Sequence, residues 1–408
     1  PEAPCPVIVV DPVRHATAAA ADLHLQLYPG SDASLAFAMM HVLKRENLID
    51  RDFLANHCIG WDELEPMLES CTPEWGEAET GVPAADIVRA AKMYGAGPAL
   101  LWLGQGLQRQ PMGGNIMRAC ATLPAICGNY AKPGAGMLYL NGGGQKGVDG
   151  DYLVAPHLDN SPDTLSQMDM AAYLENAENA RAFLCWNINP VASSPEQARL
   201  MKAMSREDLF TVVLDIFATD PTDFADYVLP AASFLEFDDL VSGYFNMSFS
   251  AQAKVAEPMG EALPNQEIFR RLASAMGFTE PELQENDADI IAHVMNGMSI
   301  DGGFAALKES GTLFPNPEPQ LQFDGHKYLT ESGKIEIASA AAEADGHPRL
   351  PQPGADARPG GGRLRLITPA SEWLMNDSYA NDPKVEKQLG AATVTINPAD
   401  AKEHGLSA

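Results

Sequence analysis

Carboxylates that could contact a nucleotide follow two apolar runs of this sequence. Asp11 comes directly after the run 7–10, and Asp215 ends the run 209–214, with Thr219 four residues later. A carboxylate at the end of a buried strand can accept hydrogen bonds from ribose hydroxyls or from the N–H edge of a guanine. An aspartate before a proline, as at position 11, is also a common turn former. Both readings stay open for Asp11.

Two amides occupy the same kind of position after a third apolar run. Asn187 and Asn189 follow the run 181–186 and precede Pro190. Their side chains could bind a phosphate or a pterin-like ring, while the next helix supplies its N-terminus. An Asx turn, in which the amide bonds only its own backbone, explains the pattern equally well.

A serine, an acid and a glycine loop complete the candidate set. Ser31 and Asp32 precede a helical run, so we expect a helix N-cap first and a ligand contact second. Gly104-Gln105-Gly106 lacks the later glycine of G-x-G-x-x-G, so no standard dinucleotide fingerprint is present. Its alternative interpretation is a plain strand-to-helix loop.

Other familiar chemistries have no support in the sequence. It contains no G-x-S-x-G, no H-E-x-x-H and no Walker A motif, which disfavours serine hydrolases, zinc proteases and P-loop NTPases. The six cysteines form no C-x-x-C pair, which disfavours a zinc ribbon or a cysteine-ligated cluster within these residues. We identify no catalytic residue and no metal ligand.

Charge and length limit the partners. The 408 residues carry 27 basic and 55 acidic side chains, a formal net charge of −28. This field repels polyanions, so we expect no nucleic-acid partner. No apolar run approaches the roughly 20 residues that a membrane span needs, so we expect no direct membrane insertion.

The elements that position these residues alternate between short apolar strands and helices. The predicted strands are 7–10, 23–27, 99–103, 181–186 and 209–214. The predicted helices are 16–22, 35–44, 115–126 and 194–204. This alternation predicts an α/β fold with parallel sheets covered on both faces and ligands at the carboxyl ends of the strands.

The last part of the sequence has a different character. Glycine-rich loops are expected at 132–136 and 141–150, and a Gly- and Pro-rich break at 351–362 marks a domain boundary near residue 360. After it, 363–368 and 393–396 are predicted strands, and Asn397-Pro398 is a helix start. A strand almost at the first residue and a helix that has barely turned at the last suggest an internal piece of a longer protein.

Taken in order, these strings resemble the large subunits of the molybdopterin oxidoreductase family, of the dimethyl sulfoxide reductase and formate dehydrogenase type. The resemblance covers nearly the whole chain and lies in the series of motifs rather than in any one of them. The matching strings are Val9-Val10-Asp11-Pro12-Val13-Arg14, Ala21-Asp22, Pro29-Gly30-Ser31-Asp32, Trp102-Leu103-Gly104-Gln105-Gly106, Gly128-Asn129-Tyr130, Lys132-Pro133-Gly134-Ala135-Gly136, Trp186-Asn187-Ile188-Asn189-Pro190, and Ala225-Asp226-Tyr227-Val228-Leu229-Pro230-Ala231.

The resemblance implies two related doubly wound nucleotide-binding domains, both incomplete, followed by the start of a C-terminal β-barrel domain. Residues 1–95 would be the later part of one domain and 96–280 the later part of the other. Residues 281–360 would connect them to the barrel segment 361–408. We also expect the 408 residues alone to show no turnover and to retain cofactor weakly or not at all.

The family binds two molybdopterin guanine dinucleotides with a molybdenum or tungsten atom. The resemblance carries this binding role to eleven positions: Asp11, Asp32, Gly104, Gln105, Asn187, Asn189, Asp215, Thr219, Asn376, Ser378 and Asn381. The family's metal-ligating residue and its cysteines for an iron–sulfur cluster would lie upstream of Pro1. The implied compartment is cytoplasmic or periplasmic, which the sequence does not distinguish.

The implied function is a two-electron oxidation or reduction of a small substrate, in anaerobic respiration or related electron transfer, with a separate iron–sulfur subunit as a candidate partner. Two alternatives remain: a metal-free scaffold subunit of a respiratory complex, and a non-redox member such as a hydratase or transhydroxylase.

One departure from the family pattern leaves the substrate class open. Many members continue from the position of Glu236 with Lys-x-Gly-Thr, whereas Asp238, Asp239, Tyr244 and Asn246 stand in this region. The two acids could line a substrate funnel, although a solvated loop is the simpler interpretation.

Overall fold

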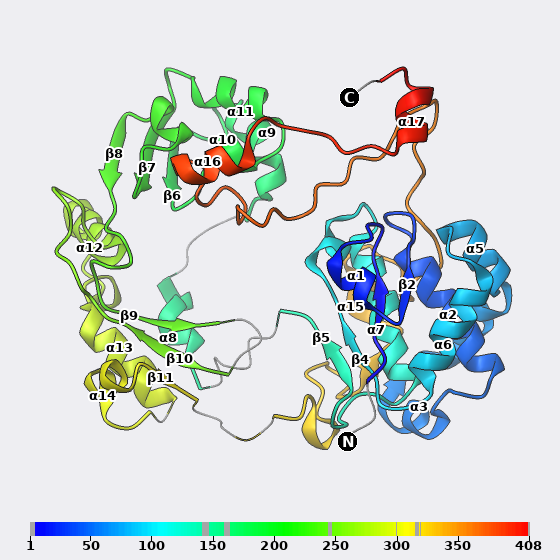
Figure 1. Cartoon of the computed structure of the whole chain (residues 1–408). Coiled ribbons are helices and arrows are strands. Elements are labelled where there is room, and N and C mark those ends of the chain that lie inside the picture. Colours follow the sequence, from blue (N-terminus) through cyan, green and yellow to red (C-terminus); the bar gives the residue numbers. More distant parts are fainter. Residues whose placement is uncertain are drawn as a thin grey trace. The chain divides into compact units, whose positions relative to one another are not determined.

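The computed structural model describes residues 5–140, 147–158, 164–243, 247–298, 300–314, 318 and 320–406 (Figure 1). Tyr244, Asn246 and most of the predicted loop 141–150 lie outside the described residues. Contacts divide the chain into two compact units. Unit 1 consists of Pro1–Gly142 and Asn316–Arg365, and unit 2 of Gly143–Pro315 and Leu366–Ala408.

Unit 1 combines short parallel strand pairs with a cluster of helices. Its strands are β1 (Ile8–Val10), β2 (Leu23–Leu25), β3 (Cys58–Ile59), β4 (Leu100–Trp102), β5 (Gly136–Leu138) and β12 (Ile335–Glu336). Its α-helices are α1 (Ala16–Ala20), α2 (Asp32–Arg45), α3 (Arg51–His57), α4 (Trp61–Leu64), α5 (Pro73–Thr80), α6 (Ala84–Gly95), α7 (Gly113–Ile126) and α15 (Ala340–Ala344), and its 3-10 helices are η1 (Glu65–Ser70), η2 (Gln105–Arg109) and η8 (Asp324–His326). The pairs β1–β2, β3–β12 and β4–β5 are all parallel.

Helix α2 is the centre of unit 1. It is apolar around most of its circumference, and side chains such as Phe37, Met40 and Leu43 are fully buried. A helix of this kind must be enclosed on several sides. Helices α5, α6 and α7 all contact it (Figure 1). The core thereby fixes the N-terminus of α2, where Asp32 lies.

Unit 2 contains one parallel and one antiparallel sheet. Its strands are β6 (Ala182–Trp186), β7 (Phe210–Asp215), β8 (Tyr227–Pro230), β9 (Asp239–Ser242), β10 (Phe249–Gln252) and β11 (Thr312–Leu313). Its α-helices are α8 (Gly150–Val154), α9 (Met170–Leu174), α10 (Pro190–Ser193), α11 (Gln197–Met204), α12 (Asn265–Met276), α13 (Asp287–Gly297), α14 (Gly303–Ser310), α16 (Pro383–Leu389) and α17 (Pro398–Glu403), and its 3-10 helices are η4 (Pro156–Leu158), η5 (Gln167–Asp169), η6 (Asp220–Phe224) and η7 (Pro281–Leu283).

The parallel sheet of unit 2 has the strand order β6–β7–β8. Trp186 pairs with Leu214 and Asp215 with Pro230, so these strands end at a common edge. Helices α9 and α11 cover one face through a buried cluster that includes Leu200 and Met204. The strands β9, β10 and β11 form the antiparallel sheet, on which α13 and α14 pack.

The five predicted apolar strands all contain observed strands, and the α/β class with parallel pairing is confirmed. Coverage on both faces is not observed. Leu100 and Trp102 of β4 are 52% and 62% exposed, and Leu184 and Trp186 of β6 are each 48% exposed. Sheets of two or three strands carry helices mainly on one side within their own unit, which leaves the alternate side chains of a strand in solvent.

The predicted C-terminal strands are wrong. Residues 363–368 and 393–396 are irregular, and the described part of 361–408 contains only an isolated bridge between Met375 and Ser378 besides α16 and α17. The described sheets form no barrel. A strand needs a hydrogen-bonding neighbour, and neither segment has one here. The predicted helix start is confirmed, since the Asn397 side chain accepts from Ala399 N at 2.8 Å.

The compact units also divide the chain differently from the predicted boundaries. The boundary after residue 95 falls inside unit 1, because α7 packs against α2. The boundary after residue 280 falls inside unit 2. Which stretch binds which nucleotide stays a prediction.

Candidate functional site

Asp11 lies at the carboxyl end of β1, as the sequence indicates. Its backbone N–H donates to Leu25 O of β2 at 3.2 Å, and its Oδ1 accepts from Val13 N at 2.7 Å. His24 Nε2 lies 2.9 Å from Asp11 O. The side chain is 38% exposed, with Oδ2 3.6 Å from His15 Nε2. Asp11 therefore forms the expected turn and still presents one oxygen to a ligand.

Asp32 is the first residue of α2, but Ser31 does not cap this helix. The Ser31 hydroxyl donates to Tyr28 O at 2.6 Å and accepts no helix N–H, so the predicted N-cap bond is wrong. Instead, both the hydroxyl and the backbone N–H of Ser31 donate to Tyr28 O within the preceding turn. The first turn of α2 therefore receives no side-chain cap from Ser31.

Burial, partly offset by a backbone hydrogen bond and reinforced by the negative charges of Asp11 and Asp356, raises the pKa of Asp32 to about 6. The structure therefore brings Asp11 and Asp32 close enough to interact. A partly buried carboxylate beside other acids is unstable as an anion until a donor or cation reaches it. Such perturbed acids are frequent at binding sites.

Gly104 and Gln105 follow β4 in the same unit. No atom lies within 4 Å of where a Cβ on Gly104 would stand, and the same holds for Gly106 and Gly114. Gln105 is exposed, and its Oε1 accepts from Arg109 at 3.4 Å. The loop thus leaves room for a ligand to approach its backbone, which fits a dinucleotide pyrophosphate.

In unit 2, both ends of the Asn189 side-chain amide are hydrogen-bonded within the protein. It is buried at 8% exposure, its Oδ1 accepts from Ala192 N at 3.1 Å, and its Nδ2 donates to Asp220 Oδ2 at 2.9 Å. The amide caps α10 as an Asx turn does. Asn187 is different: it is exposed and adopts a φ of 52°, which turns the chain at the end of β6.

Asp215 and Thr219 form a small polar pair at the end of β7. The Thr219 hydroxyl donates to Asp215 Oδ2 at 3.0 Å, and Asp215 Oδ1 accepts from Ile216 N at 2.7 Å. Asn187 N donates to Leu214 O, so the β6 and β7 ends are adjacent. The structure therefore brings Asn187, Asp215 and Thr219 to one edge of the sheet.

The three C-terminal predicted residues belong to unit 2. Asn376, Ser378 and Asn381 are exposed in and beside one turn, where Ser378 N donates to Met375 O at 3.0 Å. Within the described chain, no side-chain hydrogen bond connects them to the other eight predicted residues. Their cofactor role stays a prediction.

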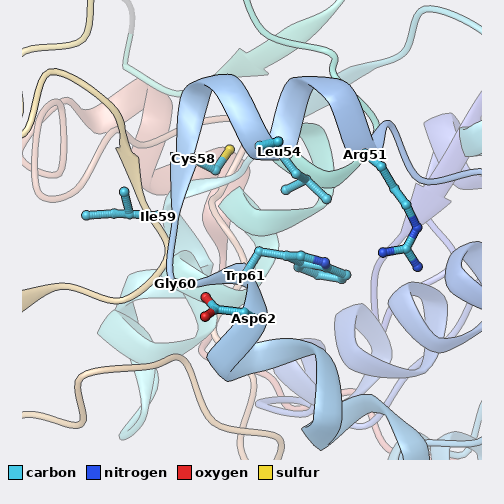
Figure 2. Close-up of a pocket in the computed structure, with 8 residues that line it drawn as sticks. Arg51, Leu54, Cys58, Ile59, Gly60, Trp61 and Asp62 are labelled. Atoms are coloured by element: carbon cyan, nitrogen blue, oxygen red, sulfur yellow. The ribbon is translucent and has the colours of Figure 1, made fainter.

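A cavity elsewhere in unit 1 contains a thiol that stays protonated and an arginine that is already paired. It measures about 490 Å³ and is formed by residues of α3, β3 and α4, including Leu54, Cys58 and Trp61 (Figure 2). Burial raises the pKa of the Cys58 thiol to about 12, so it stays protonated. The Arg51 guanidinium is paired with Glu65 at 3.0 Å.

Sequence reasoning missed Asp356, a buried acid whose charge acts on Asp32. It stands alone in a Gly- and Pro-rich break, with no periodicity or motif to single it out. Only the return of residues 316–365 to unit 1 reveals it.

Two further features of the described residues concern metal ions and membranes. They contain no group of three or more His, Cys, Asp or Glu side chains that could hold a metal ion. No helix among them combines the length and apolar character needed to cross a membrane.

Comparison with known proteins gives consistent results. A family model described as "Molybdopterin oxidoreductase" matches residues 2–275. The chain is 32% identical to "Probable oxidoreductase YoaE" of Bacillus subtilis, over 98% of this chain and 60% of the relative. It is 35% identical to "F420-dependent formate dehydrogenase 1 subunit alpha" of Methanococcus maripaludis, over 66% of this chain and 43% of that protein.

A solved structure shares the fold. Acetylene hydratase from Pelobacter acetylenicus superposes with a TM-score of 0.72 at 21% identity, over 99% of this chain and 62% of that one. The chain therefore spans about 60% of the length of the Bacillus relative and of this structure. Given the matched family model and the identity to full-length relatives, the chain belongs to the molybdopterin oxidoreductase family.

Proposed function

We propose that this chain is the nucleotide-binding part of a molybdopterin guanine dinucleotide-dependent oxidoreductase, which oxidises or reduces a small substrate by two electrons at molybdenum or tungsten. The observation that carries the proposal is the partly buried carboxylate of Asp32, which lies at a helix N-terminus beside Asp11 and forms no ion pair with the basic side chains of the described residues. The N–H edge of a guanine would supply the missing donors.

The residues present fit two dinucleotides of the proposed kind. In unit 1, Asp11 and Asp32 would accept from ribose and base, and the open loop at Gly104 and Gln105 would admit the pyrophosphate. In unit 2, Asn187, Asp215 and Thr219 would do the same at the β6–β7 edge. The bound cofactor would supply the redox chemistry, and these residues would bind and orient it.

The test is the metal and guanosine content of the protein purified at its natural length, from cells that make the cofactor. We expect molybdenum or tungsten by elemental analysis and about two guanosines per chain after acid release. Protein matured in the same cells without metal or guanosine would overturn the proposal and favour a scaffold role. Metal and nucleotide with substrate turnover but no net electron transfer would identify a hydratase or transhydroxylase instead.

The relatives guide the first substrate screen. Several are named formate dehydrogenases and one is a nitrate reductase. We therefore propose small oxyanions as the first substrate class, tested with artificial electron donors and acceptors. An iron–sulfur electron-transfer subunit is the partner proposed for such a reaction.

A further inference from the structure

A second acid, Asp356, enters the Asp32 site of unit 1 from a distant part of the sequence. Its backbone N–H donates to Gly30 O at 3.0 Å. A Cβ on Gly30 would stand 2.2 Å from Asp356 Oδ2, and Gly30 has a φ of 80°. Position 30 therefore has to be glycine both for its backbone conformation and for the side chain that lies against it.

Arg365 ties this acid to a second loop of the site. Its guanidinium donates to Asp356 Oδ2 at 3.0 Å and to Gln110 Oε1 at 2.6 Å. Gln110 follows η2, the 3-10 helix that begins after Gly104. The pair Asp356–Arg365 thus joins the loop before α2 to the loop after β4, the two loops of unit 1 that the proposed function assigns to one nucleotide.

Among the described residues, the other oxygen of Asp356 has no hydrogen-bond partner. The residue is 7% exposed, and its Oδ1 is buried without a hydrogen bond, although Oδ2 is paired. An unsatisfied buried carboxylate oxygen costs free energy, so such atoms are rare unless a ligand or water completes them. The negative charge of Asp356 also raises the pKa of Asp32, which places the two acids in one site.

We propose that Asp356 is a second base-recognition residue of this nucleotide site, whose free Oδ1 accepts an N–H of the exocyclic amine of a guanine base beside Asp32. The inference rests on the proposed function and extends it to a residue outside the eleven predicted. Guanine offers three N–H donors on this edge, one on the ring and two on the exocyclic amine. A carboxylate in a bidentate pair takes the ring N–H and one amine N–H, so a second acceptor is needed for the third. Asp32 and Asp356 together can satisfy all three.

The test compares guanosine diphosphate with inosine diphosphate, which lacks the exocyclic amine. Cofactor-free protein of natural length is titrated with each nucleotide by calorimetry. We expect the unmodified protein to prefer guanosine diphosphate. In Asp356→Asn, the amide oxygen is held by Arg365, so its NH2 group faces the donors of the base. Guanosine diphosphate should then bind at least about tenfold more weakly, the scale of one hydrogen bond to a charged group. Binding of inosine diphosphate should change little.

Two controls separate a recognition role from a structural one. Asp345→Asn changes an exposed acid of the same returning segment and should alter neither affinity. Thermal melting of Asp356→Asn verifies that the variant is folded at the titration temperature. Equally weakened binding of both nucleotides, or an unchanged preference for guanosine diphosphate, would overturn the inference. Asp356 would then serve only to hold the two loops together. Failure of the unmodified protein to bind either nucleotide would count against the proposed function itself.

Discussion

At the scale of single residues, the Asp32 carboxylate lowers the stability of the folded protein and is proposed to bind the nucleotide. Its pKa is raised from the ordinary 3.8 to about 6, chiefly by burial. The ionised form is therefore less stable in the folded protein than in the unfolded chain. A residue kept despite such a cost is typical of a site where stability and function compete.

The first prediction is that Asp32→Asn stabilises the ligand-free protein while weakening guanine nucleotide binding. Removing the charge should raise the free energy of unfolding at pH 7 by about 3 kcal/mol, since the pKa is raised from 3.8 to about 6 and each unit of pKa shift corresponds to about 1.4 kcal/mol. Urea unfolding and calorimetric titration with guanosine diphosphate measure the two effects. A variant that is destabilised yet binds normally would show that the carboxylate serves the fold.

A second prediction concerns pH. The folded-state pKa of Asp32 lies above its unfolded value, so the cost appears as pH rises from about 4 to about 6. The stability gain of Asp32→Asn should therefore be complete at pH 7 and should vanish near pH 4. The charged groups that face the same site are Asp11, Asp356 and Arg365. Because the charge of Asp356 raises the pKa of Asp32, the variant Asp356→Asn should lower that pKa and narrow the pH range over which the stability gain appears. A gain independent of pH would contradict the assignment.

At the scale of elements, the loop between β6 and α10 separates two asparagines that the sequence treats alike. Asn189 has both ends of its amide bonded within the fold, whereas Asn187 is exposed at a φ of 52°. One therefore shapes the loop, and the other is available to a ligand.

The third prediction follows from this difference. Asn189→Ala should lower the free energy of unfolding by about 1–2 kcal/mol, because it loses a helix cap and a bond to Asp220. Asn187→Asp tolerates the left-handed backbone and should leave stability nearly unchanged. Its added negative charge should repel a phosphate and reduce the released guanosine from about two per chain towards one. Normal guanosine content in Asn187→Asp would remove Asn187 from the site.

The same loop shows what sequence reasoning can reach. The run 181–186 predicts β6 because its apolar side chains recur at strand length, and the position of Asn187 at its end follows directly. The Asx turn at Asn189 is local, since its Oδ1 accepts from Ala192 N, but the other end of the amide is taken by Asp220, 31 residues further along the sequence. Likewise, 363–368 has the composition of a strand, but pairing depends on a neighbour that composition does not reveal.

At the scale of the molecule, unit 1 is discontinuous in sequence. Residues 316–365 supply β12, which pairs with β3, and Ile337, which is buried in the core beside α2 and α7. Asn115 and Gln352 exchange two hydrogen bonds of 2.9 and 2.8 Å. The returning segment also carries Asp356, so the same segment of the chain completes both the core of unit 1 and the proposed nucleotide site.

This leads to the fourth prediction, that residues 1–142 do not form a stable unit without the returning segment. Alone, they would expose the core surface that Ile337 covers and leave β3 without its strand partner. Joined to 316–365 by a flexible Gly–Ser linker, they should unfold in one cooperative transition, followed by circular dichroism in urea. In the joined protein, Ile337→Ala should lower the free energy of unfolding by about 2–5 kcal/mol, the usual cost of truncating a buried isoleucine. An equally stable, cooperative transition for 1–142 alone would show that the hydrophobic core is complete without residues 316–365. Asp356 would then belong to a segment that adds to the Asp32 site but is not needed for the fold around it.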